Sequence, residues 1–289
     1  MSQSSLPVAA RRDVPTPSGP IAVLDATPAG QDVTGRLPVV LVPGYTGSKE
    51  DFAPILGPLA AAGFRAVAMD QRGQYETPGP DHPAAYAVDA LGADVLAVVA
   101  ALGGHAHLVG HSFGGLVCRA ATIADPGAVA SLTLLDSGPA AIGGNRRERM
   151  DALEPVLGAG GMAGVYDALE RIAAGDPAWV AAPERHRDFL RRRFLAGSAA
   201  GLVAMGDALR AEPDRTGELR ATGVPVLVAY GADDDAWPPA VQADMADRLA
   251  AAHVVVSGAV HSPAVEQPEA TVRLLLEFWS GLPDRPAPS

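Results

Sequence analysis

Short apolar runs alternate with longer amphipathic stretches along most of this chain. The runs are rich in β-branched and small residues, which is typical of buried strands. We predict strands at residues 21–26, 38–42, 65–69, 105–109, 131–135, 224–230 and 253–257. A further extended segment at 31–35 would pair with 21–26 as an N-terminal hairpin.

Helices are predicted between these strands. The helical stretches cover residues 48–62, 86–102, 116–121, 239–251 and 268–279. Ser48 offers a side-chain cap at the start of the first helix, and Gly63 ends it. Strands and helices that alternate at this spacing predict an α/β fold, with a mostly parallel central sheet covered by helices on both faces.

The alternation stops between about residues 137 and 223, where helical patterns continue without a strand. The clearest pieces are 146–149, 184–194 and 202–209. An ordinary connection is far shorter, so we expect an inserted helical lid. The predicted organisation is a flexible N-terminus at 1–18, a core of 19–138 with 220–282, a helical cap at 139–219 and a flexible tail at 283–289.

Composition narrows the possible partners. The 289 residues carry a formal net charge of −11, which argues against nucleic acid and an anionic membrane surface. The single cysteine, Cys118, permits no internal disulfide, and its helical position favours a small core residue over a nucleophile. No apolar block follows Arg11-Arg12, so we expect neither an export signal nor a membrane span. We therefore expect a cytoplasmic protein. The sequence is compatible with a monomer or a homo-oligomer.

The candidate chemistry centres on Gly110-His-Ser112-Phe-Gly114, which lies between a predicted strand and a predicted helix. A turn this sharp needs glycine neighbours, and it holds the serine oxygen near backbone N–H groups at the helix N-terminus. A serine nucleophile needs a base, and the base works better when a carboxylate orients it. His261 follows the last predicted strand, and three aspartates at 233–235 follow the strand before it. Both sets are expected at the carboxyl edge of the sheet.

In this arrangement the sequence resembles the α/β-hydrolase superfamily, in particular its serine esterase and C–C hydrolase branch with a helical cap. The resemblance covers nearly the whole chain outside the lid and tails. Five ordered pieces carry it: Pro43-Gly44-Tyr45-Thr46, Asp70-x-Arg72-Gly73, the serine turn, Gly231-x-x-Asp234-x-x-x-Pro238 and His261. The family usually has His-Gly where this chain has Pro43-Gly44.

The resemblance implies roles for particular residues. It selects Ser112, Asp234 and His261 as the catalytic set, with Asp233, Asp235 and Asp136 as minor alternatives for the acid. It places the oxyanion hole at the backbone N–H groups of Tyr45 and Phe113. It implies that Tyr45 and Trp237 face the substrate pocket, that Asp70 and Arg72 support the oxyanion loop as an ion pair, and that His111 makes structural hydrogen bonds.

These features predict a serine hydrolase that cleaves an ester, lactone or thioester bond of a small, largely apolar substrate through an acyl-enzyme. The lid residues that indicate an apolar substrate, and that serve equally well to pack the lid, are Met150, Met162, Trp179, Phe189, Phe194 and Met205. C–C bond hydrolysis, cofactor-free perhydrolysis and non-catalytic ligand binding remain alternatives on the same fold. The sequence has no metal-ligand spacing, dinucleotide fingerprint or P-loop lysine, so we expect no metal and no cofactor.

Overall fold

An eight-stranded sheet forms the centre of the computed structural model, which describes residues 9–28, 36–175 and 177–282. The strands are β1 (Ala10–Thr16), β2 (Gly19–Ala26), β3 (Val39–Val42), β4 (Ala66–Met69), β5 (Ala106–His111), β6 (Val129–Leu135), β7 (Val226–Gly231) and β8 (Ala252–Val256). Their order is β1-β2-β4-β3-β5-β6-β7-β8. The six strands from β4 to β8 in that order are parallel, and the β1–β2 hairpin is antiparallel to its neighbours.

Helices connect the parallel strands as the sequence pattern predicts. They are α1 (Ala53–Ala61), α2 (Val88–Ala101), α3 (Phe113–Ala124), α9 (Pro239–Leu249), α10 (Pro263–Glu266) and α11 (Pro268–Ser280), with short 3-10 helices at Lys49–Phe52, Pro83–Tyr86 and Pro126–Ala128. Within the described residues, no helix combines the length and the apolar character needed to cross a lipid bilayer.

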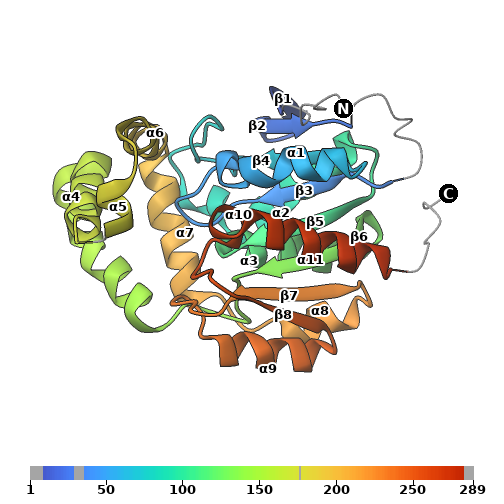
Figure 1. Ribbon diagram of the computed structural model, residues 1–289. Helices are drawn as coiled ribbons and strands as arrows, with labels where there is room; N and C mark the ends of the chain where they lie inside the picture. The colour runs from blue at the N-terminus through green and yellow to red at the C-terminus, as the bar shows by residue number, and fades with distance from the viewer. Residues whose placement is uncertain (1–8, 29–35, 176, 283–289) are drawn as a thin grey trace, which may run out of the picture.

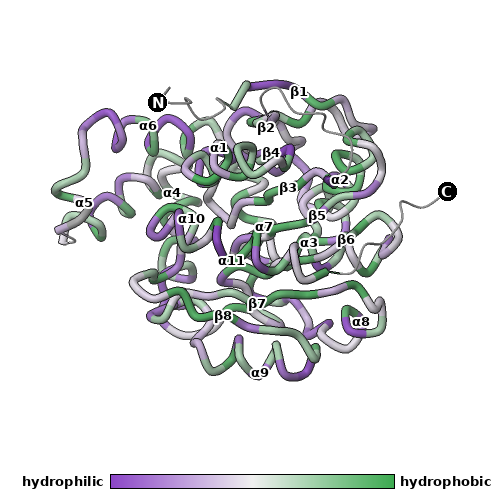
Figure 2. The backbone as a smooth tube through the Cα atoms, turned by 45° about the vertical axis from the view of Figure 1, so that its right-hand side comes forward, coloured by the Kyte–Doolittle hydropathy of each residue, from purple (hydrophilic) through white to green (hydrophobic). Residues whose placement is uncertain are grey.

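Alternate residues of the central strands, β3 to β7, pack into two separate cores, as the period of a β-strand requires. Val40 and Val42 pack with α2 and α3, whereas Val39 and Leu41 pack with α1 and α11. Figure 2 shows the central strands β5 and β7 in the hydrophobic colour along most of their length. This two-sided burial explains why the strand sequences are continuously apolar, and it confirms the predicted α/β architecture.

The N-terminal region differs from the prediction of a flexible segment at 1–18. Residues 10–16 form β1, which pairs along its whole length with β2. β1 lies at the sheet edge and is mostly exposed, and its three consecutive charged residues, Arg11 to Asp13, leave no apolar run that could be detected in the sequence. The hairpin partner of β2 therefore precedes it in the sequence. The alternative partner at 31–35 and the tail at 283–289 lie outside the described residues.

A helical insertion separates β6 from β7, and it comprises α4 (Gly144–Ala173), α5 (Pro177–Ala181), α6 (Glu184–Leu195), α7 (Ala199–Ala211) and α8 (Thr216–Ala221). In Figure 1, α4, α5 and α6 stand beyond one end of the sheet, and α7 lies between them and the strands. Helix α4 is kinked at Gly161, which has a φ of 59°. Helix α8 belongs to the body, because its Leu219 is buried in the core beside α3 and α9.

Arg119 of α3 fastens both ends of this insertion to the body. Its guanidinium donates to the Pro139 carbonyl at the entry of the insertion and to the Glu212 carboxylate, 2.7 Å away, at its exit. The two ends also bond each other, since the Ala141 N–H donates to the Glu212 carbonyl at 2.8 Å. Arg119 is 1% exposed, so this is a buried ion pair rather than a surface contact.

Candidate active site

Ser112 occupies a strained turn at the carboxyl end of β5. Its φ of 53° and ψ of −121° lie in a region that residues with side chains rarely adopt. The neighbouring glycines leave no room for a side chain: a Cβ at Gly110 would lie 2.4 Å from the Gly114 carbonyl oxygen, and one at Gly114 would lie 2.3 Å from the Val42 carbonyl oxygen. The predicted requirement for glycine on both sides of the serine thus has a direct steric cause.

Three side chains from distant parts of the sequence form one hydrogen-bonded chain beside this turn. The His261 Nε2 atom lies 3.1 Å from the Ser112 Oγ atom, and the His261 Nδ1 atom lies 2.8 Å from the Asp234 Oδ1 atom. Ser112, Asp234 and His261 are 7%, 5% and 6% exposed, so the chain is shielded from bulk water while the serine still reaches a cavity. In this arrangement the imidazole can accept the hydroxyl proton while the carboxylate holds its other nitrogen.

Asp234 is the aspartate that contacts His261, whereas its neighbours Asp233 and Asp235 are exposed. The Ala236 N–H donates to Asp234 Oδ1 at 2.9 Å, and the Gln242 amide donates to Asp234 Oδ2 at 2.6 Å. Gln242 is fully buried on α9. Sequence reasoning missed it, because a single glutamine eight residues after an aspartate matches no motif.

A second buried carboxyl group, that of Asp136, lies next to these three hydrogen-bonded side chains. Carboxyl oxygens of Asp136 and Asp234 and a ring nitrogen of His261 lie within 4.8 Å of one another, and all are atoms that can bind a metal ion. Both ring nitrogens of His261 already face hydrogen-bond partners, Asp234 and Ser112, so the imidazole has no nitrogen left for a metal in this arrangement. The geometry therefore fits a hydrogen-bonded cluster better than a metal site.

The loop after β3 passes directly against Ser112. A Cβ at Gly44 would lie 3.2 Å from the Ser112 Cβ, so the backbone of the Gly44-Tyr45 segment runs beside the serine. On the other side Phe113 begins α3, and the first N–H groups of a helix have no partner within it. The N–H groups of Tyr45 and Phe113 are thus placed on the two segments that flank the Ser112 side chain.

Two glutamines hold this loop in place. The Gln71 amide donates to the Pro43 carbonyl at 2.8 Å, and the Gln74 amide donates to the carbonyls of Gly44 and Tyr45 at 2.7 and 3.0 Å. Both glutamines are almost fully buried. They lie within and just after the Asp70-x-Arg72-Gly73 motif, which gave the only sequence signal for a supporting role here.

Asp70 and Arg72 support the same region, but not as the ion pair that the resemblance implied. Asp70 binds the fully buried Lys49, whose Nζ atom lies 2.8 Å from its Oδ2 atom. Arg72 instead binds Asp94 on α2 at 2.6 Å. Each residue therefore ties the turn after β4 to a different element, one to the segment after the oxyanion loop and one to the helix beneath the sheet.

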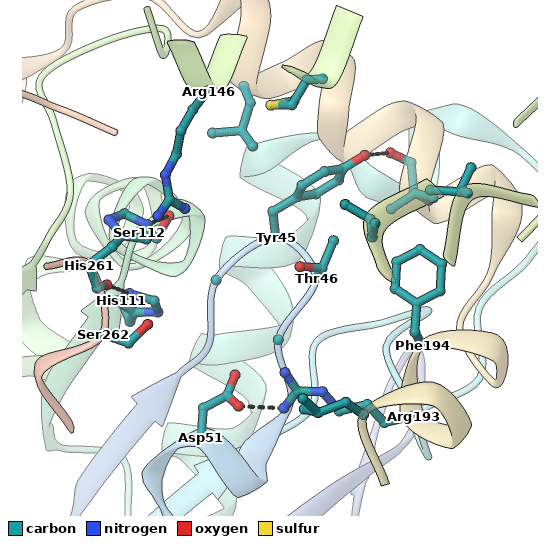
Figure 3. Close-up of a pocket in the computed structure, with 18 of the residues that line it drawn as sticks. Tyr45, Thr46, Asp51, His111, Ser112, Arg146, Arg193, Phe194, His261 and Ser262 are labelled. Atoms are coloured by element: carbon teal, nitrogen blue, oxygen red, sulfur yellow. Dashed lines mark hydrogen bonds and ion pairs between the residues drawn. The ribbon is translucent and has the colours of Figure 1, made fainter. Parts of the chain in front are cut away.

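His111 has the structural role that was predicted for it. Its Nε2 atom lies 2.5 Å from the His261 carbonyl oxygen, a contact drawn in Figure 3. Burial and the neighbouring His261 lower the pKa of His111 to about 4, so the ring is neutral at neutral pH and donates from Nε2. Cys118 is fully buried as expected, and burial raises the pKa of its thiol.

A cavity of about 710 Å³ lies between the insertion and the body, with Ser112 and His261 in its wall. Apolar residues of the insertion form much of the lining, among them Met150, Leu153, Leu157, Phe189, Phe194 and Leu202. Figure 3 shows Tyr45 reaching across the cavity toward α7, where its hydroxyl donates to the Leu202 carbonyl at 2.5 Å. Of the lid residues singled out from the sequence, Met205 packs into the body core instead.

Trp237 does not line this cavity, contrary to the expectation that it faces the substrate pocket. Its side chain is buried, and its indole N–H donates to the Ala140 carbonyl at 3.1 Å. A Cβ at Gly138 would lie 2.0 Å from its ring, so the indole packs tightly on the start of the insertion. Trp237, which closely follows Asp234, thus anchors the start of the insertion to the body.

Two ion pairs join the insertion to the rim of the cavity. Arg146 of α4 lies 2.7 Å from Asp235, which follows Asp234 directly, and Arg193 of α6 binds Asp51. Figure 3 shows the Arg146 side chain extending toward the region of Ser112 and His261, and Arg193 meeting Asp51 at the other end of the view. These pairs place charges at two sides of an otherwise largely apolar cavity.

The chain matches known hydrolases along most of its length. Residues 39–274 match the model of the Alpha/beta hydrolase family. The chain is 34% identical to "Putative carbamate hydrolase RutD" of Variovorax paradoxus, over 83% of this chain and 90% of that one. It is 33% identical to the pimeloyl-[acyl-carrier protein] methyl ester esterase of Methylococcus capsulatus, over 86% and 96%. The crystal structure of the esterase RhEst1 from Rhodococcus sp. superposes with a TM-score of 0.75 at 25% identity, covering 94% and 99%.

Proposed function

The chain belongs to the alpha/beta hydrolase family, and we propose that it is a carboxylesterase that works through an acyl-enzyme on Ser112. The observation that supports this most is the hydrogen-bonded chain from Ser112 through His261 to Asp234. In this proposal Ser112 is the nucleophile, His261 is the general base and then the general acid, and Asp234 orients the imidazole and stabilises its protonated form.

The reaction follows from this geometry in two halves. His261 Nε2 takes the Ser112 proton as Oγ attacks the carbonyl carbon, and it returns that proton to the leaving alcohol. The N–H groups of Tyr45 and Phe113 stabilise the oxyanion, where one such donor is worth about 3 kcal/mol. Water then attacks the acyl carbonyl carbon while His261 removes its proton, and His261 returns that proton to Ser112 Oγ as the bond from Oγ to the acyl group breaks and the carboxylic acid leaves.

The cavity supports a substrate with a sizeable apolar part. Its volume of about 710 Å³ is that of a pocket for a drug-sized molecule, and its wall from the insertion is mostly aliphatic and aromatic. We therefore propose that helices α4 to α7 of the insertion act as a cap that holds the apolar acyl or alcohol group of a small-molecule ester. A thioester or lactone would present the same carbonyl to the same groups.

Carbamate hydrolysis is a second candidate, because a relative with that name is 34% identical to this chain. The same nucleophile and oxyanion donors would serve a carbamate carbonyl. A small polar carbamate would leave most of the apolar cavity unfilled, and for this reason we place the ester first. C–C hydrolysis, perhydrolysis and ligand binding without turnover would use the same pocket and are separated by assay.

The experiment is a kinetic comparison across p-nitrophenyl esters of increasing acyl length, with a p-nitrophenyl carbamate in parallel. The proposal predicts turnover of esters by the wild type and a loss of at least about 1,000-fold in kcat for Ser112→Ala and for His261→Gln. Ser257→Ala and His253→Gln alter exposed residues on and directly after β8, the strand that precedes His261, and serve as matched controls with wild-type rates. Unchanged turnover by Ser112→Ala would refute the assignment, and faster turnover of the carbamate would reverse the order of the two candidates.

A further inference from the structure

Asp136 is a buried carboxyl group for which the proposed reaction has no use. It follows β6 directly, is 0% exposed, and has a φ of 47°, a conformation that an aspartate adopts at some cost. Its Oδ1 atom accepts the Gly231 N–H at 2.8 Å, at the end of the neighbouring strand β7. Its Oδ2 atom is buried and accepts a hydrogen bond from no donor among the described residues.

The unpartnered oxygen lies in a cluster that already holds one negative charge. Carboxyl oxygens of Asp136 and Asp234 and a ring nitrogen of His261 lie within 4.8 Å of one another. Two ionised carboxylates this close in a dry site repel each other strongly, so one of them holds a proton or a cation lies between them. Asp234 accepts hydrogen bonds from Gln242, Ala236 and His261, and these bonds stabilise its ionised form. The proton therefore belongs on Asp136.

We propose that Asp136 is a positioning residue that stays protonated at neutral pH and donates a hydrogen bond from Oδ2 to the Asp234 carboxylate. This inference rests on the proposed function, and it adds Asp136 as a fourth member to the hydrogen-bonded series of Asp234, His261 and Ser112. The neutral carboxyl group leaves Asp234 as the single charge facing the imidazole. Together with the Gln242 amide it also restrains the Asp234 carboxylate, so that Oδ1 stays aimed at His261 Nδ1.

The electrostatics of the site agree with this assignment. Burial, with the nearby charge of Asp234, raises the pKa of Asp136 to about 9. The titratable groups around Asp136 are Asp234 on the loop after β7, His261 on the loop after β8 and Glu266 on α10. The two carboxylates among them oppose ionisation of Asp136. When Asp136 does ionise at high pH, its hydrogen bond to Asp234 is replaced by repulsion, and the orientation of His261 loosens.

Two variants separate a positioning role from a merely structural one. In Asp136→Asn the side chain still accepts from the Gly231 N–H and donates to Asp234, but it does not ionise. In Asp136→Ala the side chain makes neither hydrogen bond. With a p-nitrophenyl ester, Asp136→Asn is expected to keep kcat within about threefold of the wild type. Asp136→Ala is expected to lose about tenfold in kcat with little change in KM, the value of one hydrogen bond to a charged group. The wild type should lose activity in a transition near pH 9, and Asp136→Asn should lack that transition.

An infrared titration tests the proton without any substrate. The wild type should show the C=O band of a protonated carboxyl group that disappears between pH 7 and pH 10, and this band should be absent in Asp136→Asn but present in the exposed-site control Asp233→Asn. The proposal fails if the wild type lacks the band, if Asp136→Ala matches Asp136→Asn in kcat, or if a tightly bound metal ion is found whose removal changes the pH profile. A protein that shows the band but hydrolyses no ester would refute the proposed function and leave the protonation of Asp136 established.

Discussion

Replacing Asp136 by Asn should make the protein's stability less sensitive to alkali. The pKa of Asp136 is about 9 in the folded protein, against about 4 in an unfolded chain. Between these values the folded state holds a proton that the unfolded state has released, so the stability contributed by this group is fully present below pH 4 and is lost as the pH rises toward 9. Asn removes that dependence.

The magnitude follows from the linkage relation. One proton difference changes the free energy of unfolding by at most about 1.4 kcal/mol per pH unit. From pH 5 to pH 8 the stability of Asp136→Asn relative to the wild type should therefore increase by up to about 4 kcal/mol. Urea unfolding of both proteins at each pH unit, with Asp233→Asn as the exposed control, measures this difference. A difference that stays constant across the range would mean that Asp136 is ionised throughout, and the reasoning would be wrong.

Four further substitutions test three other parts of the structure. Arg119→Met and Glu212→Gln should each cost about 3–5 kcal/mol in urea unfolding, because each leaves a buried charge without its partner; a cost below about 1 kcal/mol for either variant would refute the ion-pair explanation. Gln74→Ala removes the donor to the Gly44 and Tyr45 carbonyls of the oxyanion loop, so it should lower kcat about tenfold at nearly constant KM in ester hydrolysis. A change in KM alone would argue against a role for Gln74 in positioning the loop. Gly114→Ala would place a Cβ 2.3 Å from a carbonyl oxygen and should lower the melting temperature by more than about 5 °C, and an unchanged melting temperature would contradict the packing of this turn.

Much of the fold was predictable because burial imposes a simple pattern on the sequence. Strands β3 to β7 are covered on both faces, so each appears as an apolar run. The edge strand β8 is largely exposed but is also rich in apolar residues, and strands β3 to β8 match the predicted ones to within a few residues. β1 escaped prediction because an exposed edge strand has no such pattern. The predicted boundary between cap and core, at 219/220, falls inside helix α8, and only the packing of Leu219 against α3 and α9 assigns the whole helix to the body.

The groups that surround the site were harder to predict than the site itself. Ser112, Asp234 and His261 lie at fixed places in ordered motifs, so the sequence placed them together. The residues that hold the site and the insertion in place act through contacts that match no sequence motif. Gln242 donates to Asp234 from the first turn of α9, and Arg119 donates to Glu212, which lies 93 positions away in the sequence. Trp237 shows the same limit, because its place beside the acid suggested the pocket while its packing on Gly138 decides otherwise.

The most direct test of the account is to find which side chain becomes covalently labelled. A fluorophosphonate reacts with an activated serine, and digestion followed by mass spectrometry identifies the modified residue. One adduct is expected, on Ser112, and it should form rapidly in the wild type and in Asp233→Asn but slowly in His261→Gln. An adduct on another serine, or no adduct in a correctly folded protein, would contradict the claim that Ser112, His261 and Asp234 act as one catalytic unit.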